Sequence, residues 1–269
     1  MRSLIALLSL VAASGSGLAA PTPISPPPLV RLAPPAPPAP PAPPAPRPLG
    51  ATEKRASQAE ALSFVKAYSP SDLRREAEIG LLRRDFVKGL RREPSTALMF
   101  DTFPTLGEAI TTAMASQIDV YIEEYDERFF PRATEIVATS LARDDVLKLT
   151  AFYRSALGRK VLASSAAKVD GSEVIDRAIA GQEVDAGVAR RQAMRAGMAT
   201  FSVLTPAERG QIIALAQSPA GQRFQTIMPQ LLAVQVELTN KPGPKFEAGA
   251  KAAMGEAFKR VTGTDPFAR

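Results

Sequence analysis

An internal repeat limits the fold of this chain more than any other feature of its sequence. Residues 204–232 align without a gap on residues 141–169, an offset of 63 positions (204 minus 141). Two segments that match in register indicate a structural unit that occurs twice. The matched pairs are Leu204 with Leu141, Glu208 with Asp145, Ala214 with Ala151, Ser218 with Ser155 and Gly221 with Gly158.

Each copy predicts a helix, a sharp break and a second helix. In the later copy, Thr205 and Glu208 can form a capping box, and Pro206 stands at the first helical position, where no amide is missed. Ser218 precedes a proline and is therefore pushed out of the helical region, and its hydroxyl can cap the next helix. Gly221 has no side chain, which lets the two helices approach closely at the corner.

Apolar periodicity predicts helices in the rest of the chain as well. We expect helices over residues 58–68, from 71 to about 92, from 104 with a break or kink near Pro131, from about 173 to 204, and over 245–261. Pro94 should close the second of these. Since no segment alternates like a strand, the sequence predicts an all-α fold, a helical bundle built around two helix–break–helix repeats at 141–169 and 204–232.

The two corner motifs also carry a family resemblance. Phe-Tyr-Arg-Ser-Ala-Leu-Gly-Arg-Lys-Val-Leu-Ala at 152–163 and Ser-Pro-Ala-Gly-Gln-Arg-Phe at 218–224 resemble the signature of domain-of-unknown-function family 2059, over roughly residues 58–262. The resemblance implies an exported, all-helical protein, mostly proteobacterial, with no assigned activity. Ala156 stands where the family has proline, which leaves two alternatives for the first copy, a corner or a single bent helix.

The first 19 residues have the pattern of a secretory signal peptide. Arg2 precedes an apolar run over residues 4–13, and small residues follow up to Ala19, after which cleavage fits best. The apolar run is too short to span a bilayer, and no cysteine follows it to carry a lipid anchor. We therefore expect a periplasmic protein, exported by a cleaved signal peptide and without a transmembrane segment in the mature chain. The alternative is an uncleaved leader that stays as an anchor.

Residues 20–50 form a Pro/Ala-rich segment that contains more than half of the chain's 25 prolines. Such a sequence favours an extended polyproline helix of roughly 3.1 Å per residue. The favoured interpretation is a solvated, disordered low-complexity linker, and the alternative is a spacer or a docking strand. The helical domain should then occupy residues 51–265.

The composition excludes several kinds of chemistry. The chain has no cysteine, no histidine and no tryptophan, so thiolate nucleophiles, His-based catalysis and Cys/His zinc sites are excluded. We expect no metal and no cofactor.

Two Ser-x-x-Lys patterns, Ser63 with Lys66 and Ser165 with Lys168, match the nucleophile and lysine of penicillin-recognising enzymes, but the companion motifs are missing. The acidic residues Asp119, Glu123, Glu124, Asp126 and Glu127 could form a cation site or a glycosidase-like pair, although a solvated acidic helix face is favoured.

Two groups of basic residues are candidate binding sites in this chain of net charge +6. Free amides and cations at the two corners could hold a phosphate or carboxylate, and a second cluster could hold anionic headgroups. For each, the competing interpretation is structural: capping serines and outward cations at the corners, and a solvated helix face for the cluster. The anion-binding candidates are Ser155, Gly158, Arg159, Lys160, Ser218, Gly221 and Arg223; the basic patch is Arg83, Arg84, Lys88, Arg91 and Arg92.

Two function classes follow from the sequence. The first is a non-catalytic binding or interaction module of the cell envelope, with an envelope protein, a lipid headgroup or a cell-wall component as partner. The second is a periplasmic hydrolase that uses a Ser-Lys or carboxylate pair. Export argues against nucleic acid as a partner.

Overall fold

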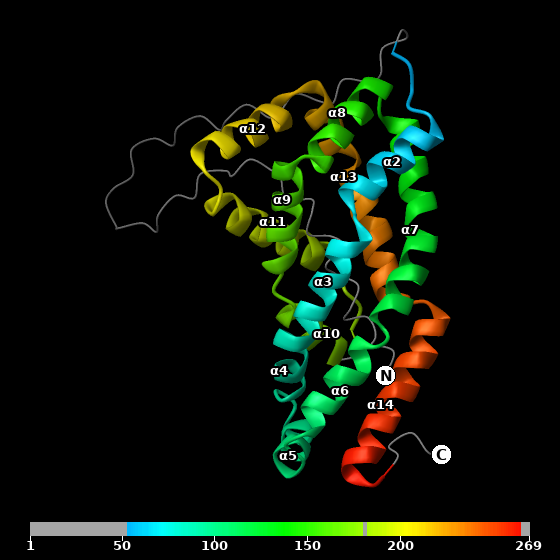
Figure 1. Cartoon of the computed structure of the whole chain (residues 1–269), viewed down its shortest axis with the longest axis vertical. Helices are drawn as coiled ribbons and strands as arrows, with labels where there is room; N and C mark the ends of the chain where they lie inside the picture. The colour runs from blue at the N-terminus through cyan, green and yellow to red at the C-terminus, as the bar shows by residue number, and fades with distance from the viewer. Residues whose placement is uncertain (1–52, 180–181, 265–269) are drawn as a thin grey trace, which may run out of the picture.

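The structure is a computed structural model that describes residues 53–179 and 182–264 (Figure 1). These ranges contain no strand beyond one isolated bridge between Arg55 and Ala142, so the predicted all-α fold is confirmed. The predicted signal peptide (1–19) and Pro/Ala-rich segment (20–50) lie outside the described residues. In chain order the helices are α2 (Gln58–Tyr68), α3 (Ser71–Leu81), the π-helical turn η3 (Leu82–Phe86), α4 (Val87–Leu90), α5 (Pro94–Thr102), α6 (Leu106–Ala115), α7 (Ile118–Ser140), α8 (Arg143–Arg154), α9 (Ala156–Ala167), α10 (Ser172–Ile179), α11 (Ala186–Ser202), α12 (Pro206–Gln217), α13 (Pro219–Asn240) and α14 (Pro244–Thr262).

Four aromatic rings tie α2, α8 and α13 together in the core. Phe64 and Tyr68 of α2 contact Tyr153 of α8 and Phe224 of α13, with ring centroids 5.4 to 6.2 Å apart. All four rings are buried, and such pairs add about 0.5–1.5 kcal/mol each beyond the burial of their area. Figure 1 shows α2, α7 and α13 packed together in one half of the molecule and α6 against α14 in the other.

The break expected as one alternative near Pro131 is absent, because α7 runs through this residue. The chain breaks instead at Ser116 and Gln117, between α6 and α7. Pro131 is exposed, so water can bond to the backbone carbonyl that has no N–H partner at this residue. Phe129 and Ala133, two residues before and two after Pro131, are fully buried and anchor the helix in the core. Although α7 is 23 residues long, neither it nor any other helix in the described ranges has the length and apolar character to cross a membrane.

The prediction of a single helix over residues 173–204 is wrong, because the structure has two helices there, α10 and α11. A side chain from the end of α13 stabilises the connection: Asn240 accepts from Val184 N at 2.9 Å and donates to Val184 O at 2.8 Å. Asp185 then caps α11 by accepting from Val188 N at 2.9 Å. The connection is therefore held both by a local cap and by a remote side chain that the local pattern does not contain.

The helix expected over residues 71–92 is less regular than predicted. It has a π-helical turn, η3, in the middle and ends at Leu90. Ser71 is the first helical residue rather than the cap, and its hydroxyl donates to Asp126 at 2.6 Å. Pro94, expected only to close this helix, begins the short helix α5, because a proline at the first helical position loses no hydrogen bond.

The first repeat copy turns a sharp corner at Ser155, which separates α8 from α9. Ser155 is extended (φ −68°, ψ 162°), and its hydroxyl donates to Phe152 O at 2.7 Å and accepts from Gly158 N at 3.1 Å. A Cβ atom on Gly158 would lie 2.1 Å from Phe152 O, so glycine is needed for this close approach. The first copy is thus a corner and not a bent helix, even with alanine rather than proline at position 156.

The second copy repeats this geometry at Ser218. The residue has φ −70° and ψ 157°, and its hydroxyl donates to Leu215 O at 2.7 Å and accepts from Gly221 N at 3.2 Å. A Cβ atom on Gly221 would again lie 2.1 Å from the carbonyl oxygen, here that of Leu215. The capping box of Thr205 and Glu208 also forms. The predicted helix–break–helix geometry is therefore confirmed in both copies.

The two copies exchange contacts with each other. We call α7, α8 and α9 the first unit and α11, α12 and α13 the second. Helix α7 packs on α13, and the corresponding helix α11 packs on α9. Arg223 pairs with Asp145 at 2.9 Å, and their counterparts 63 residues away, Lys160 and Glu208, pair at 2.7 Å. Contacts exchanged in this way are those of a two-fold arrangement, as in a symmetric dimer.

Candidate functional site

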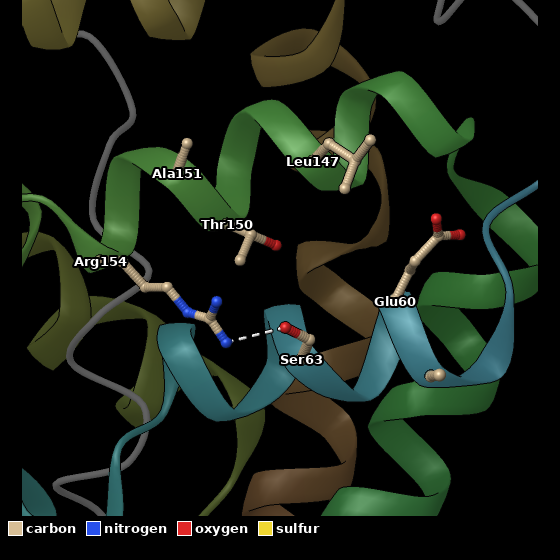
Figure 2. Close-up of a pocket in the computed structure, with 7 residues that line it drawn as sticks. Glu60, Ser63, Leu147, Thr150, Ala151 and Arg154 are labelled. Carbon is tan, nitrogen blue, oxygen red and sulfur yellow. Dashed lines mark hydrogen bonds between the residues drawn. The ribbon is translucent and has the colours of Figure 1, made fainter.

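An open groove of about 450 Å³ lies between α2 and α8. It runs along two neighbouring helices and ends where α8 meets the first corner (Figure 2). Its lining is mainly apolar with a few polar groups, which is the usual composition of a binding site. The lining residues are Ala59, Glu60 and Ser63 from α2 and Leu147, Thr150, Ala151 and Arg154 from α8.

The two ends of the groove differ in charge. Figure 2 shows Arg154 reaching from α8 towards α2, where it donates to Ser63 Oγ at 2.9 Å. Arg154 forms no ion pair with any residue in the described ranges. At the other end Glu60 is satisfied, because it accepts from Arg143 at 2.6 Å and from the Ser57 amide at 3.0 Å. The amide and hydroxyl of Ser57 and the guanidinium of Arg143 lower the pKa of Glu60 from 4.5 to about 2. The groove therefore presents one cation whose partner is uncharged.

No motif or spacing in the sequence predicts this groove. Its one large apolar lining residue is Leu147, which is 44% exposed. The one sequence feature that could have indicated the groove is the position of Leu147. This leucine lies beside the buried stripe of α8, which includes Val146 and Leu149. A leucine off the buried stripe is common on protein surfaces, so its position alone predicts no site.

The two Ser-x-x-Lys patterns have different surroundings. Ser165 is buried in the domain and lies 3.0 Å from the hydroxyl of Thr200, which accounts for its polar group. Ser63 is on the face of α2 that lines the groove and faces α8. Lys66 points elsewhere, because its ammonium group lies 5.9 Å from the ring centroid of Phe130 on α7. Neither serine therefore has its lysine as hydrogen-bond partner within the described structure.

The acidic residues of α7 serve mainly as partners for other helices. Asp126 accepts from Arg74 at 2.6 Å, and Asp119 pairs with Arg75. Glu124 is only 6% exposed and accepts from the amides of Lys245 and Phe246 at 3.0 and 2.8 Å. The expected solvated face is thus wrong for Glu124, which caps the start of α14, while Glu123 and Glu127 are exposed.

The cations predicted to bind an anion at the corners all have carboxylate partners. Ser155, Gly158, Ser218 and Gly221 form the corner contacts described above, as the structural interpretation expects. A phosphate bound here would have to displace a protein carboxylate from each cation, and the anion site stays a prediction. Arg159 pairs with Asp72 at 2.6 Å, Lys160 with Glu208 at 2.7 Å, and Arg223 with Glu53 at 2.7 Å and Asp145 at 2.9 Å.

The predicted basic patch lies along η3, α4 and the turn that follows α4, and its five cations are not equivalent. Arg84 donates to the carbonyls of Ala167 and Val169, Arg91 pairs with Asp101, and Arg92 pairs with Asp176. Arg83 and Lys88 are exposed and form no hydrogen bond or ion pair with another described residue. The patch therefore offers two free cations, which is less than the sequence predicts.

Comparison of the chain with protein-family models, with curated proteins and with solved structures finds no match. The resemblance to domain-of-unknown-function family 2059, carried by the residues of the two corners, therefore stays a prediction.

Proposed function

We propose that the chain is a non-catalytic interaction module of the cell envelope, exported to the periplasm, and that the groove between α2 and α8 receives an apolar segment of a partner protein. The single observation that carries this proposal is the lining of the groove. Leu147 and Ala151 supply exposed apolar surface, and Arg154 supplies a cation beside it. An apolar side chain followed by a carboxylate would complement both features, because burying the apolar group is favourable and the charge would gain a partner.

The engagement of other polar groups supports a binding role. Ser165 bonds to Thr200 inside the domain, and Glu124 and Asp126 are held by α14 and by Arg74. These side chains stabilise contacts between helices. The groove, by contrast, leaves an apolar surface and a cation accessible.

Crosslinking in living cells tests the proposal. A photoreactive residue at Leu147 should give a discrete crosslinked product in the envelope fraction, and the same residue at Leu98, an exposed leucine of α5 outside the groove, should not. Ala151→Arg should abolish the product at Leu147, because the long side chain fills an exposed position of the groove. Equal products at both positions, or recovery of the protein in the cytosol, would contradict the proposal.

The alternative is a periplasmic hydrolase, and one observation favours it. Ser63 lines the groove and its Oγ accepts from Arg154, so a cation stands beside a hydroxyl. A covalent hydrolase would be labelled at Ser63 by a fluorophosphonate or a penicillin, since both acylate or phosphonylate an activated serine. Labelling that disappears in Ser63→Ala and persists in Ser165→Ala would establish this alternative and replace the binding role.

A further inference from the structure

Exposed large apolar side chains gather on one arm of the molecule. Six such side chains occur in the described ranges, and four of them lie on or between α11 and α12. Figure 1 shows these two helices projecting together from the side of the body. Exposed large apolar side chains that share one helix face can form an interaction site. The four side chains are Met194 (46% exposed), Met198 (44%), Val203 (54%) and Ile213 (42%).

Helix α11 has two faces with different partners. Its inner face, which includes Val188 and Ala196, is buried, and the helix packs on α9 and α13. Arg190, Met194 and Met198 follow one another at intervals of four residues, so they share one face. All three are exposed, and this face therefore has no partner among the described residues.

The exposed face of α11 is also basic. Residues 186–217 contain four arginines and one glutamate, so this segment carries +3 (four minus one) of the chain's net charge of +6. Arg191 pairs with Glu173, but Arg190 and Arg195 are exposed and form no ion pair with a described residue. Most exposed arginines of the other helices have a carboxylate partner, for example Arg75 and Arg132.

We propose that the face formed by Arg190, Met194, Arg195 and Met198, named here the α11 stripe, docks on an anionic lipid surface. Met side chains are flexible and apolar enough to enter the boundary between headgroups and acyl chains. Arginines beside them can bury their stems and keep the guanidinium groups among the phosphates. This docking surface is distinct from the groove, and it does not depend on what the groove binds.

The shape of the stripe favours a lipid surface over a protein segment. A partner helix is usually received in a groove between helices. The groove described above lies between α2 and α8, whereas the side chains of the stripe are exposed on a single helix. An outward helical face that combines apolar and basic side chains suits the plane of a membrane interface.

Vesicle sedimentation of the full chain tests the charge of the stripe. The chain should sediment with vesicles of phosphatidylglycerol and phosphatidylethanolamine at low salt, and far less with phosphatidylcholine or at high salt. Each arginine near an anionic surface raises partitioning by about fivefold, so R190E/R195E should lower it by about 25-fold or more. R83E/K88E changes two exposed cations of the basic patch by the same charge and should leave partitioning within about threefold of the wild type.

The chain has no tryptophan, so a single introduced tryptophan reports on depth. In Met198→Trp, fluorescence should shift to the blue on addition of anionic vesicles, and brominated lipids should quench it. Leu98→Trp, exposed on α5, should show neither effect. The proposal is overturned if the wild type does not sediment with anionic vesicles at low salt, if R190E/R195E and R83E/K88E weaken sedimentation equally, or if both tryptophans respond alike. Unchanged thermal unfolding of each variant keeps loss of folding separate from loss of docking.

Discussion

Arg223 Nε lies 2.9 Å from Asp145 Oδ2. The equivalent residues of the other repeat copies form the same kind of pair: Lys160, which corresponds to Arg223, lies 2.7 Å from Glu208, which corresponds to Asp145. In both pairs the acid stands in the first turn of the first helix of one copy, and the base stands in the second helix of the other copy. The two repeats therefore stabilise each other by exchange, and neither copy contains a complete ion pair of this kind by itself.

The two pairs should differ in energy because they differ in burial. The side chains of Arg223 and Asp145 are 15% and 9% exposed, while Lys160 is 48% exposed. Arg223→Met leaves a mostly buried carboxylate without its cation and should lower the free energy of unfolding by about 3 kcal/mol. Lys160→Met should change it by less than about 1 kcal/mol. Urea denaturation followed by circular dichroism measures both values.

A double variant separates the pair from other contacts of Arg223. Asp145→Asn combined with Arg223→Met should recover part of the stability lost in Arg223→Met, because no unpaired charge is left. Glu53→Gln controls for the second partner of Arg223 and should have a smaller effect. Equal losses in Arg223→Met and Lys160→Met would show that burial does not distinguish the pairs.

The corner glycines should be intolerant of even one extra methyl group. In Gly158→Ala and Gly221→Ala the new Cβ atom would lie 2.1 Å from a backbone oxygen, which cannot move without shifting the helix. Each change should cost about 1–3 kcal/mol or more, as overpacking does. Gly210→Ala is the matched control, since its Cβ atom meets nothing within 4 Å in the interior of α12. It should stabilise the protein by up to about 1 kcal/mol because alanine favours the helix. Thermal unfolding would contradict this account if all three variants behaved alike.

The features that the sequence predicts well are those whose partners are close in the chain. The hydroxyl of Ser218 bonds to an amide three residues away, and the capping box of Thr205 and Glu208 spans the same distance. Each can be read from residue types and spacing alone. The corners, the start of α12 and the final helix were therefore predicted to within a residue or two.

The features that the sequence misses depend on remote partners. Glu124 bonds to the amide of Phe246, 122 positions away, and Asn240 holds Val184 across 56 positions. The groove likewise requires α2 and α8 to lie side by side, which no spacing within either helix reveals. Local patterns predict helices and caps, but they do not predict which helices become neighbours.

The cap that Glu124 provides should be important for α14. Helix α14 begins after Gly243, which offers no side chain, so Glu124 satisfies two amides that would otherwise be free. Glu124→Ala should lower the free energy of unfolding by about 1–3 kcal/mol and speed hydrogen exchange at the start of α14. Glu123→Ala, at the exposed neighbouring position, should change neither. Unaltered exchange in α14 of the Glu124 variant would exclude the capping role.

Stability should fall in acid partly through the two capping-box glutamates. Hydrogen bonds from Ser57 and Arg143 lower the pKa of Glu60 from 4.5 to about 2, and Lys160 with Thr205 lowers that of Glu208 from 4.5 to about 2. A carboxyl group whose pKa is lower in the folded state stabilises the fold at pH values above its unfolded pKa. This contribution is lost as the pH falls from about 4.5 to about 2.

Glu60→Gln combined with Glu208→Gln keeps side chains that can cap but removes the titration. The urea midpoint of this variant should therefore decline less steeply between about pH 5 and pH 2 than that of the wild type. Glu127→Gln, on an exposed position of α7, should leave the slope unchanged, and identical slopes in all three proteins would rule out this origin of the acid sensitivity.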